Sequence, residues 1–387
     1  MISRMRWFAR SRTNAAGCAA TERPDDLAAR FVAYPDFAKI LAHGKTRCAG
    51  ELLRGLQVDL RIVAPDSFGA ALYYFTGAKA HTIAVRAIAR KRKLKINEYG
   101  VFRGKRRIAG ATEDEVFASV GLPYIAPELR ENRGEIEAAR ERRLPELVAL
   151  ADLRGDLQMH TTTTDGRSTL AEMAAAARAL GHDYIAITEH TQVLKMTRGL
   201  DRKGLLAQRR AIGRINERGD KPYVLWGAEV DILQDGTLDL DDATLAELDL
   251  VLVSVHTHLE MPRAAMTDRI LRAIRHPRVH VLAHPTSRLI GKRAATAVDV
   301  EHVIAAARES GVVLEINAQP DRLDLDDVYT RAARDAGAPL VISSDAHHAD
   351  ELRYLRYGID VARRAWCEAN DVVNTLPLRA LRARLRR

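Results

Sequence analysis

Histidines and carboxylates recur in the second half of this sequence at the ends of short apolar runs. Both side chains bind divalent metal ions such as zinc, manganese or iron. A site with many of them can hold two or three ions, which lower the pKa of a bound water and neutralise phosphate oxygens. That chemistry hydrolyses phosphoesters, so the pattern predicts a multinuclear metal site. The recurring residues are His160, Asp165, His190, Glu229, His256, His258, His284, Glu315, Asn317, Asp345 and His347.

Apolar runs after residue 149 must position these side chains. The runs span residues 156–160, 184–190, 223–230, 250–256, 280–284, 312–317 and 340–345. Thr169 and Glu172 form a capping box that opens the first intervening helix, and Gly181, Gly311 and Gly337 stand where helices should end. Alternating strands and helices give parallel strands with right-handed crossovers. The pattern predicts a closed or nearly closed barrel with its site at the C-terminal strand ends, with a flat doubly wound sheet as the alternative.

The recurring histidines and carboxylates indicate a metal site more strongly as a set than any one of them does alone. One histidine at a strand end is more often structural than a ligand, but here four histidines close four of the seven runs. Glu315 and Asn317 are expected to orient ligands. Arg288, four residues after His284, could clamp a phosphate, because a guanidinium fork fits phosphate oxygens; an exposed loop arginine is the alternative. His258 is a further candidate for substrate binding.

Composition indicates a globular protein. The 387 residues are 47% hydrophobic and 29% charged, which suits two or three domains. The 3 cysteines form no disulfide or zinc pattern, and no apolar run could span a bilayer, so we expect a cytoplasmic protein with no membrane partner. The net charge of +9 favours nucleic acid as a partner, with an arginine-rich composition as the alternative.

The chain is expected to have three regions. Residues 1–22 show no period and predict an unstructured basic tail. Residues 23–148 form an α+β domain, in which residues 56–63 alternate almost strictly between polar and apolar and predict a strand. Residues 149–387 form the α/β barrel.

The barrel region resembles the polymerase-and-histidinol-phosphatase (PHP) domain family. Its motifs occur here as Asp156-Leu-Gln-Met-His160, Ile187-Thr-Glu-His190, Gly227-Ala-Glu229, Ser254-Val-His256, Ala283-His-Pro285 and Ser344-Asp-Ala-His347. The resemblance implies a distorted seven-stranded PHP barrel with two or three divalent ions, manganese or zinc. By position, the metal ligands would be His160, Asp165, His190, Glu229, His256, His284, Asp345 and His347, with His160, Asp165, His190 and Asp345 catalytic. The family usually has a histidine where this chain has Gln158, and because an amide oxygen is a poorer ligand, one metal position is expected to be weakened.

The region before the barrel resembles the later palm and the thumb of bacterial family X DNA polymerases, which carry a C-terminal PHP domain. The matching segments are Leu56-Gln-Val-Asp59-Leu, Tyr74-Phe-Thr-Gly77, Asn97-Glu-Tyr-Gly100 and Gly121-Leu-Pro-Tyr124. The resemblance covers about residue 25 to the end. It implies a metal-dependent 3′–5′ exonuclease that processes gapped or 3′-ended DNA in repair, with a monomer favoured.

Part of that family's polymerase region has no match in this chain. Asp59 matches the third catalytic aspartate, but no Asp-x-Asp pair, Gly-Ser motif or helix-hairpin-helix module is recognisable before it. One carboxylate cannot hold the two ions of nucleotidyl transfer. Tyr74 and Gly77 would still contact a nucleotide sugar. We therefore expect a polymerase truncated at its front, with residues 1–22 derived from a displaced start codon or a frameshift.

Alternatives to the exonuclease stay open at this point. One is a gap-filling DNA polymerase of family X, which the missing carboxylates disfavour. Another is a DNA-binding remnant with weak catalysis. The last is a small-molecule phosphatase similar to those that hydrolyse histidinol phosphate, against which the thumb-like segment argues.

Overall fold

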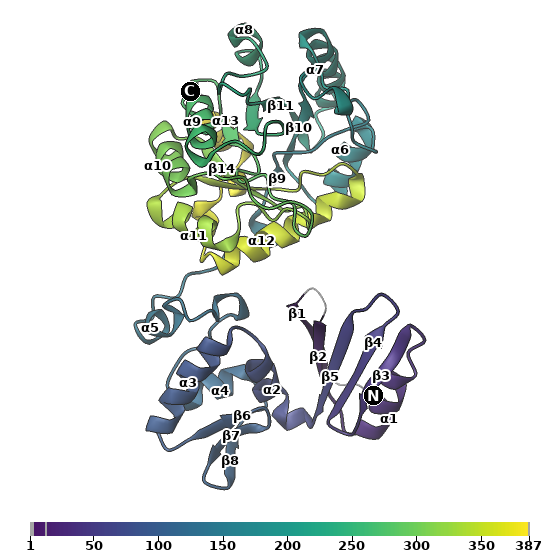
Figure 1. Ribbon diagram of the computed structural model, residues 1–387, viewed down its shortest axis with the longest axis vertical. Helices are drawn as coiled ribbons and strands as arrows, with labels where there is room; N and C mark the ends of the chain where they lie inside the picture. Colours follow the sequence, from purple (N-terminus) through teal and green to yellow (C-terminus); the bar gives the residue numbers. More distant parts are fainter. Residues whose placement is uncertain (1–3, 12–13, 386–387) are drawn as a thin grey trace. The chain divides into compact units, whose positions relative to one another are not determined.

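The computed structural model describes residues 4–11 and 14–385, and the chain divides into two compact units, Met1–Leu144 and Pro145–Arg387 (Figure 1). Among these residues, every helix is too short or too polar to cross a bilayer.

The second unit is built on a sheet of seven parallel strands that follow one another in sequence order. The strands are β9 (Gly155–Asp156), β10 (Tyr184–His190), β11 (Tyr223–Asp231), β12 (Leu250–Ser254), β13 (Val281–Leu282), β14 (Val313–Asn317) and β15 (Leu340–Ser343). The two edges of this sheet meet just beyond β9 and β15, where Met159 forms a parallel bridge with Ala346. The sheet is therefore a nearly closed barrel, as predicted, and the flat alternative is excluded.

Side chains of these strands are buried on both faces. In β10, Ile185 and Ile187 belong to the core between strands and helices, whereas Tyr184 and Ala186 belong to a second core inside the barrel. Parallel strands covered on both faces have this continuous apolar composition. The surrounding helices are α6 (Leu170–Ala179), α7 (Arg202–Asn216), α8 (Asp242–Leu245), α9 (Arg263–Ile274), α10 (Val300–Ser310), α11 (Asp327–Ala336), α12 (Leu355–Arg364) and α13 (Leu378–Leu385) (Figure 1).

Local sequence signals set the ends of several helices. The capping box predicted at Thr169 and Glu172 opens α6, with both reciprocal hydrogen bonds formed. Gly311 and Gly337 end α10 and α11 in the left-handed conformation, which glycine adopts without a steric penalty. These helices return the chain so that each following strand starts at the same end of the barrel.

Asn374 links the first strand of the barrel, β9, to the last, β15, through side-chain hydrogen bonds. Its Nδ2 donates to the Gly155 and Ile342 carbonyl oxygens, 2.8 Å away in each case, and its Oδ1 accepts from the Ile342 amide at 3.2 Å. We expect Asn374→Ala to lower the free energy of unfolding by about 3 kcal/mol, because buried backbone groups lose their partners. Urea unfolding followed by circular dichroism measures the change. Asn370→Ala, at an exposed position nearby, is the matched control, and equal stability of the two variants would contradict this role.

The first unit contains two smaller sheets. The larger one has the order β1-β2-β5-β4-β3 and the smaller one β6-β7-β8. The strands are β1 (Arg4–Ser11), β2 (Asn14–Ala20), β3 (Phe37–His43), β4 (Arg47–Leu52), β5 (Gln57–Val63), β6 (Lys95–Asn97), β7 (Gly100–Arg103) and β8 (Arg106–Ala109). The helices are α1 (Pro24–Val32), α2 (Phe68–Phe75), α3 (Lys79–Lys91), α4 (Glu113–Ser119) and α5 (Glu135–Arg140). The strand predicted over residues 56–63 is β5.

The prediction of an unstructured tail over residues 1–22 is wrong for most of that range. Residues 4–11 and 14–20 are β1 and β2, and β2 pairs in parallel with β5. The C-terminal part of β2, Ala16 to Ala20, is buried throughout and consists of alanine, glycine and cysteine. Small residues in a buried strand give no polar and apolar alternation, so the sequence lacks the signal that marks β5.

Candidate metal centre

The barrel strands bring the predicted ligands together at their C-terminal ends. Each side chain is at the end of its strand or a few residues beyond it. His190 closes β10, Glu229 lies near the end of β11, and His256 and His284 each lie two residues after their strands. His160 follows β9, and Asp345 and His347 follow β15.

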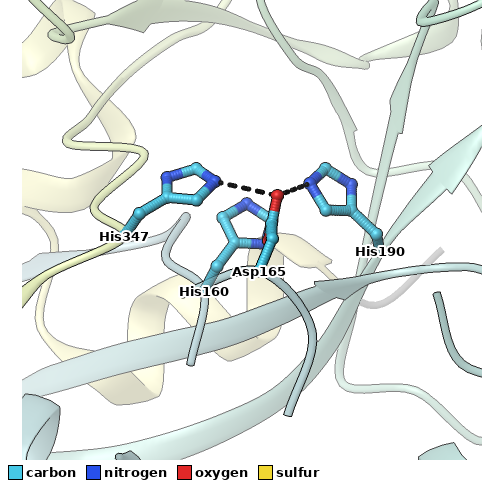
Figure 2. A group of neighbouring side chains, drawn as sticks. All are labelled: His160, Asp165, His190 and His347. Atoms are coloured by element: carbon cyan, nitrogen blue, oxygen red, sulfur yellow. Dashed lines mark ion pairs between the residues drawn. The ribbon is translucent and has the colours of Figure 1, made fainter. Parts of the chain in front are cut away.

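Asp165 lies between histidines that come from three different parts of the barrel (Figure 2). Its Oδ2 is 3.4 Å from His190 Nε2 and 3.5 Å from His347 Nε2. Its Oδ1 is 4.0 Å from His160 Nδ1, and the His160 ring stacks on both other imidazoles. One atom from each of these four residues lies within 4.8 Å of the others, which is close enough to coordinate one ion.

Glu229 is the carboxylate at the middle of the centre. Its Oε2 lies 3.3 Å from His160 Nε2 and 3.4 Å from His190 Nδ1. Its Oε1 lies 2.8 Å from His284 Nε2 and 3.4 Å from His256 Nε2. Glu229 therefore joins two further groups that could hold an ion: one with His190 and His256, the other with His160 and Asp345.

Unpaired buried atoms support the assignment of metal ligands. Both ring nitrogens of His160, Nδ1 of His190 and Oε2 of Glu229 are buried without a hydrogen-bond partner in the described part of the chain. Leaving such groups unpaired costs free energy, and a coordinated cation removes that cost. The donor set of imidazoles and carboxylates is the one that zinc and manganese bind. The residues present therefore fit a metal-dependent centre.

Gln158 is a buried member of the same region. Its side chain is fully buried, and neither amide atom has a hydrogen-bond partner among the residues described. The protein thus does not use this amide to satisfy another group. Whether its carbonyl oxygen serves as a weak ligand stays a prediction.

A layer of polar residues orients the ligands. The predicted orienting residues Glu315 and Asn317 are both buried: Glu315 Oε2 accepts from the His284 amide at 2.7 Å, and Asn317 Nδ2 donates to Asp345 Oδ2 at 3.0 Å. Asp231, which we did not predict, lies 3.3 Å from His256 Nδ1. Its spacing from Glu229, two residues along one strand, places both side chains on one face and was the available signal.

The carboxylates of the centre control the protonation of its imidazoles. Burial alone would lower the pKa of His160, but the Asp345 and Glu229 carboxylates, which lie close to its Nε2, outweigh burial and raise that pKa well above its usual value. Burial would also raise the pKa of Glu229, but the charges of His190 and His256 outweigh it and hold that pKa well below its usual range. Without a metal ion, the centre thus favours a protonated His160 beside a charged Glu229 carboxylate.

Proton release should therefore accompany metal binding. The pKa values of His160, His256 and His347 are raised, burial being outweighed by neighbouring carboxylates, so these rings keep their protons to a higher pH than a free imidazole does. A metal ion binds neutral imidazole, so binding displaces these protons and affinity rises with pH. Calorimetric titration of metal-free protein with Mn²⁺ in buffers of different ionisation enthalpy counts the protons. Zero release at pH 7 would contradict these raised pKa values.

The predicted substrate residue Arg288 does not act as a free phosphate clamp. Its guanidinium donates to the Arg322 carbonyl at 2.8 Å, to the Leu323 carbonyl, and to Asp326 at 3.4 Å. These acceptors occupy the guanidinium N–H donors of Arg288 that a phosphate would need, so the prediction for Arg288 is corrected. His258 is exposed and lines an open cavity of about 530 Å³ next to His256.

The predicted nucleotide-binding residues lie in the first unit. Asp59 on β5 is buried and accepts from Arg47 Nη2 at 2.7 Å and from Gln57 Nε2 at 2.8 Å. Tyr74 is half-buried near the end of α2, and Gly77 has φ +85°, with the Arg130 backbone packed where a Cβ would lie. Among residues 4–11 and 14–144, no group of histidine, cysteine or carboxylate side chains is arranged to hold a metal ion.

Comparisons with known proteins agree with this division of the chain. The DNA polymerase beta thumb family matches residues 71–131, and the PHP domain family matches residues 156–319. The chain is 37% identical over 372 residues to the DNA polymerase/3'-5' exonuclease PolX of Bacillus subtilis (strain 168), covering 95% of this chain and 65% of that relative.

Shorter relatives match a little over half of this chain. A probable phosphatase of Thermoanaerobacter sp. (strain X514) is 27% identical over 231 residues, which cover 57% of this chain and 89% of that protein. A probable phosphatase of Edwardsiella ictaluri (strain 93-146) is 30% identical over 236 residues, covering 58% of this chain and 91% of that protein.

Proposed function

We propose that the chain is PolX-like, with a PHP barrel after a DNA polymerase beta thumb region, and that the barrel hydrolyses DNA stepwise from its 3′ end. The observation that carries the proposal is the convergence of five histidines with Asp165, Glu229 and Asp345 at one end of the barrel. Two or three divalent ions, Mn²⁺ or Zn²⁺, are proposed at this centre. They would activate water and neutralise the phosphate.

Some side chains of the centre would bind the ions, and others hold those ligands in place. Asp165, with His160, His190 and His347, would hold one ion, and Glu229 would lie between the remaining groups. The neutral form of His284 is favoured, because burial and the Arg322 charge lower its pKa to about 4. His284 therefore stays ready to coordinate, while Asn317 and Glu315 hold Asp345 and the His284 backbone in place.

DNA is the proposed substrate because the thumb region precedes the barrel. The net charge of +9 favours a polyanion, and the Bacillus relative is a DNA polymerase and 3′-5′ exonuclease by name. The chain spans 65% of that relative's length. Gapped or 3′-ended DNA in a cytoplasmic repair reaction is the substrate that we propose, with the chain acting as a monomer.

A phosphatase acting on small phosphomonoesters is the second candidate, favoured by the barrel's likeness to the probable phosphatases. Turnover of a 3′-ended oligonucleotide and of p-nitrophenyl phosphate by the same Mn²⁺-loaded protein separates the candidates. The proposal predicts a higher kcat/KM for the oligonucleotide. A higher value for p-nitrophenyl phosphate would assign the barrel to small molecules instead.

DNA synthesis is not part of the proposal. On the strands that flank Asp59, the residues paired directly with it are Ala16 and Ala49, so neither cross-strand partner supplies a second carboxylate. The Asp59 carboxylate is already paired with Arg47. We therefore expect no incorporation of a labelled nucleotide into gapped DNA, and templated extension would overturn this part of the account.

A further inference from the structure

The segment after β14 brings Arg322 next to Asp345 of the metal centre. Arg322 Nε lies 3.5 Å from Asp345 Oδ2, and the side chain is 16% exposed. Its Nη1 is buried and has no hydrogen-bond partner in the part of the chain that is described. A buried N–H of a charged group is costly unless a partner completes it, so this atom indicates a missing acceptor.

The backbone around Arg322 is fixed from several sides. The Arg322 amide donates to the Gln319 carbonyl at 2.8 Å, and the Arg322 carbonyl accepts from Arg288 Nε at 2.8 Å. Leu323 has φ +46°, a left-handed conformation that a leucine keeps only where its surroundings impose it. The Arg288 guanidinium also donates to the Leu323 carbonyl, and the Leu323 amide donates to the Gln319 carbonyl at 3.0 Å. Arg322 is therefore held in place before any substrate arrives.

The guanidinium lies among the ligands and not at the outer rim. Asp345 directs Oδ1 toward His160, 3.2 Å away, and its Oδ2 toward Asn317 and Arg322. A cation in this position reaches an anion bound to the centre from the side of Asp345.

We propose that Arg322 forms an anion subsite beside the metal centre and binds a non-bridging oxygen of the substrate phosphate. A guanidinium presents N–H donors in a fixed fork, which fits phosphate geometry. Arg288 is then a positioning residue, which explains why its own fork is occupied by backbone carbonyls. The inference rests on the proposed function, because it takes a phosphodiester as the substrate.

Binding of inorganic phosphate to the Mn²⁺-loaded full chain tests the subsite without any turnover. We expect Arg322→Met to weaken phosphate binding, measured by calorimetry, by at least about tenfold, the size of a hydrogen bond to a charged group. Arg322→Lys, which keeps the charge and loses the fork, should weaken it less. Arg308→Met, an exposed position on α10 with the same loss of charge, is the matched control and should bind phosphate as the unaltered chain does.

Manganese content separates a substrate contact from a structural role. In Arg322→Met, weaker phosphate binding with unchanged bound manganese supports the subsite. Unchanged phosphate affinity overturns it, and so does a parallel loss of manganese, which would limit Arg322 to holding Asp345. If Arg322→Met does not fold, Arg322→Lys is read by the same criteria. Arg322-dependent phosphate binding in a chain that hydrolyses no DNA would leave the subsite standing and refute the proposed function.

Discussion

Glu229→Gln is expected to lower kcat for DNA hydrolysis by at least about a thousandfold, the scale seen when a central catalytic group is removed. The substitution keeps the shape of the side chain but removes the charge that faces His160, His190, His256 and His284. It also leaves two of the potential metal groups without their only glutamate. Gel analysis of oligonucleotide products gives the rate, and elemental analysis gives the bound manganese.

A matched control for this change is Glu247→Gln. Glu247 is a partly exposed glutamate that pairs with Arg202 and Arg209, away from the ligands. The control should keep its activity and its manganese. Full activity and full manganese content in Glu229→Gln would remove Glu229 from the centre.

His284→Ala is the second change with a large expected effect. The His284 imidazole is buried, with Nε2 2.8 Å from Glu229 Oε1, and its backbone amide is fixed by Glu315. Because its lowered pKa keeps the ring neutral, it can coordinate a metal ion over the whole neutral range. Its removal should reduce turnover by about a thousandfold and lower the manganese content.

His276→Ala provides the comparison for this variant. His276 follows α9, is paired with Asp242 at 3.1 Å, and belongs to none of the groups that could hold an ion in the described part of the chain. The His276→Ala variant should hydrolyse DNA at the same rate as the unaltered chain. Unchanged turnover and metal content in His284→Ala would show that this imidazole is not a ligand.

The barrel could be predicted because its signals are local. Strand β10 coincides with the predicted run over residues 184–190, and helix ends follow glycine and capping residues. The site could be predicted for a related reason. In parallel strands with one direction, residues at equivalent ends meet at one rim, so His190, Glu229 and His284 share a site although far apart in sequence.

Other features depend on contacts that sequence patterns do not encode. Asn374 joins Gly155 to Ile342, and the partners are 219 and 32 residues away. Sequence patterns do not show which of Arg288 and Arg322 faces a phosphate and which holds the loop backbone. That difference depends on how the two loops pack against each other. Strand β2 was not predicted because its small buried side chains show no alternation between polar and apolar residues.

Hydrolysis of a 5′-labelled single-stranded oligonucleotide with Mn²⁺, with and without a chelator, tests whether the barrel is a metal-dependent nuclease. We predict stepwise shortening from the 3′ end that stops on chelation and returns when Mn²⁺ is restored. Folded, metal-loaded protein that leaves the oligonucleotide intact, or shortening that continues in the chelator, would contradict a metal-dependent nuclease in the barrel.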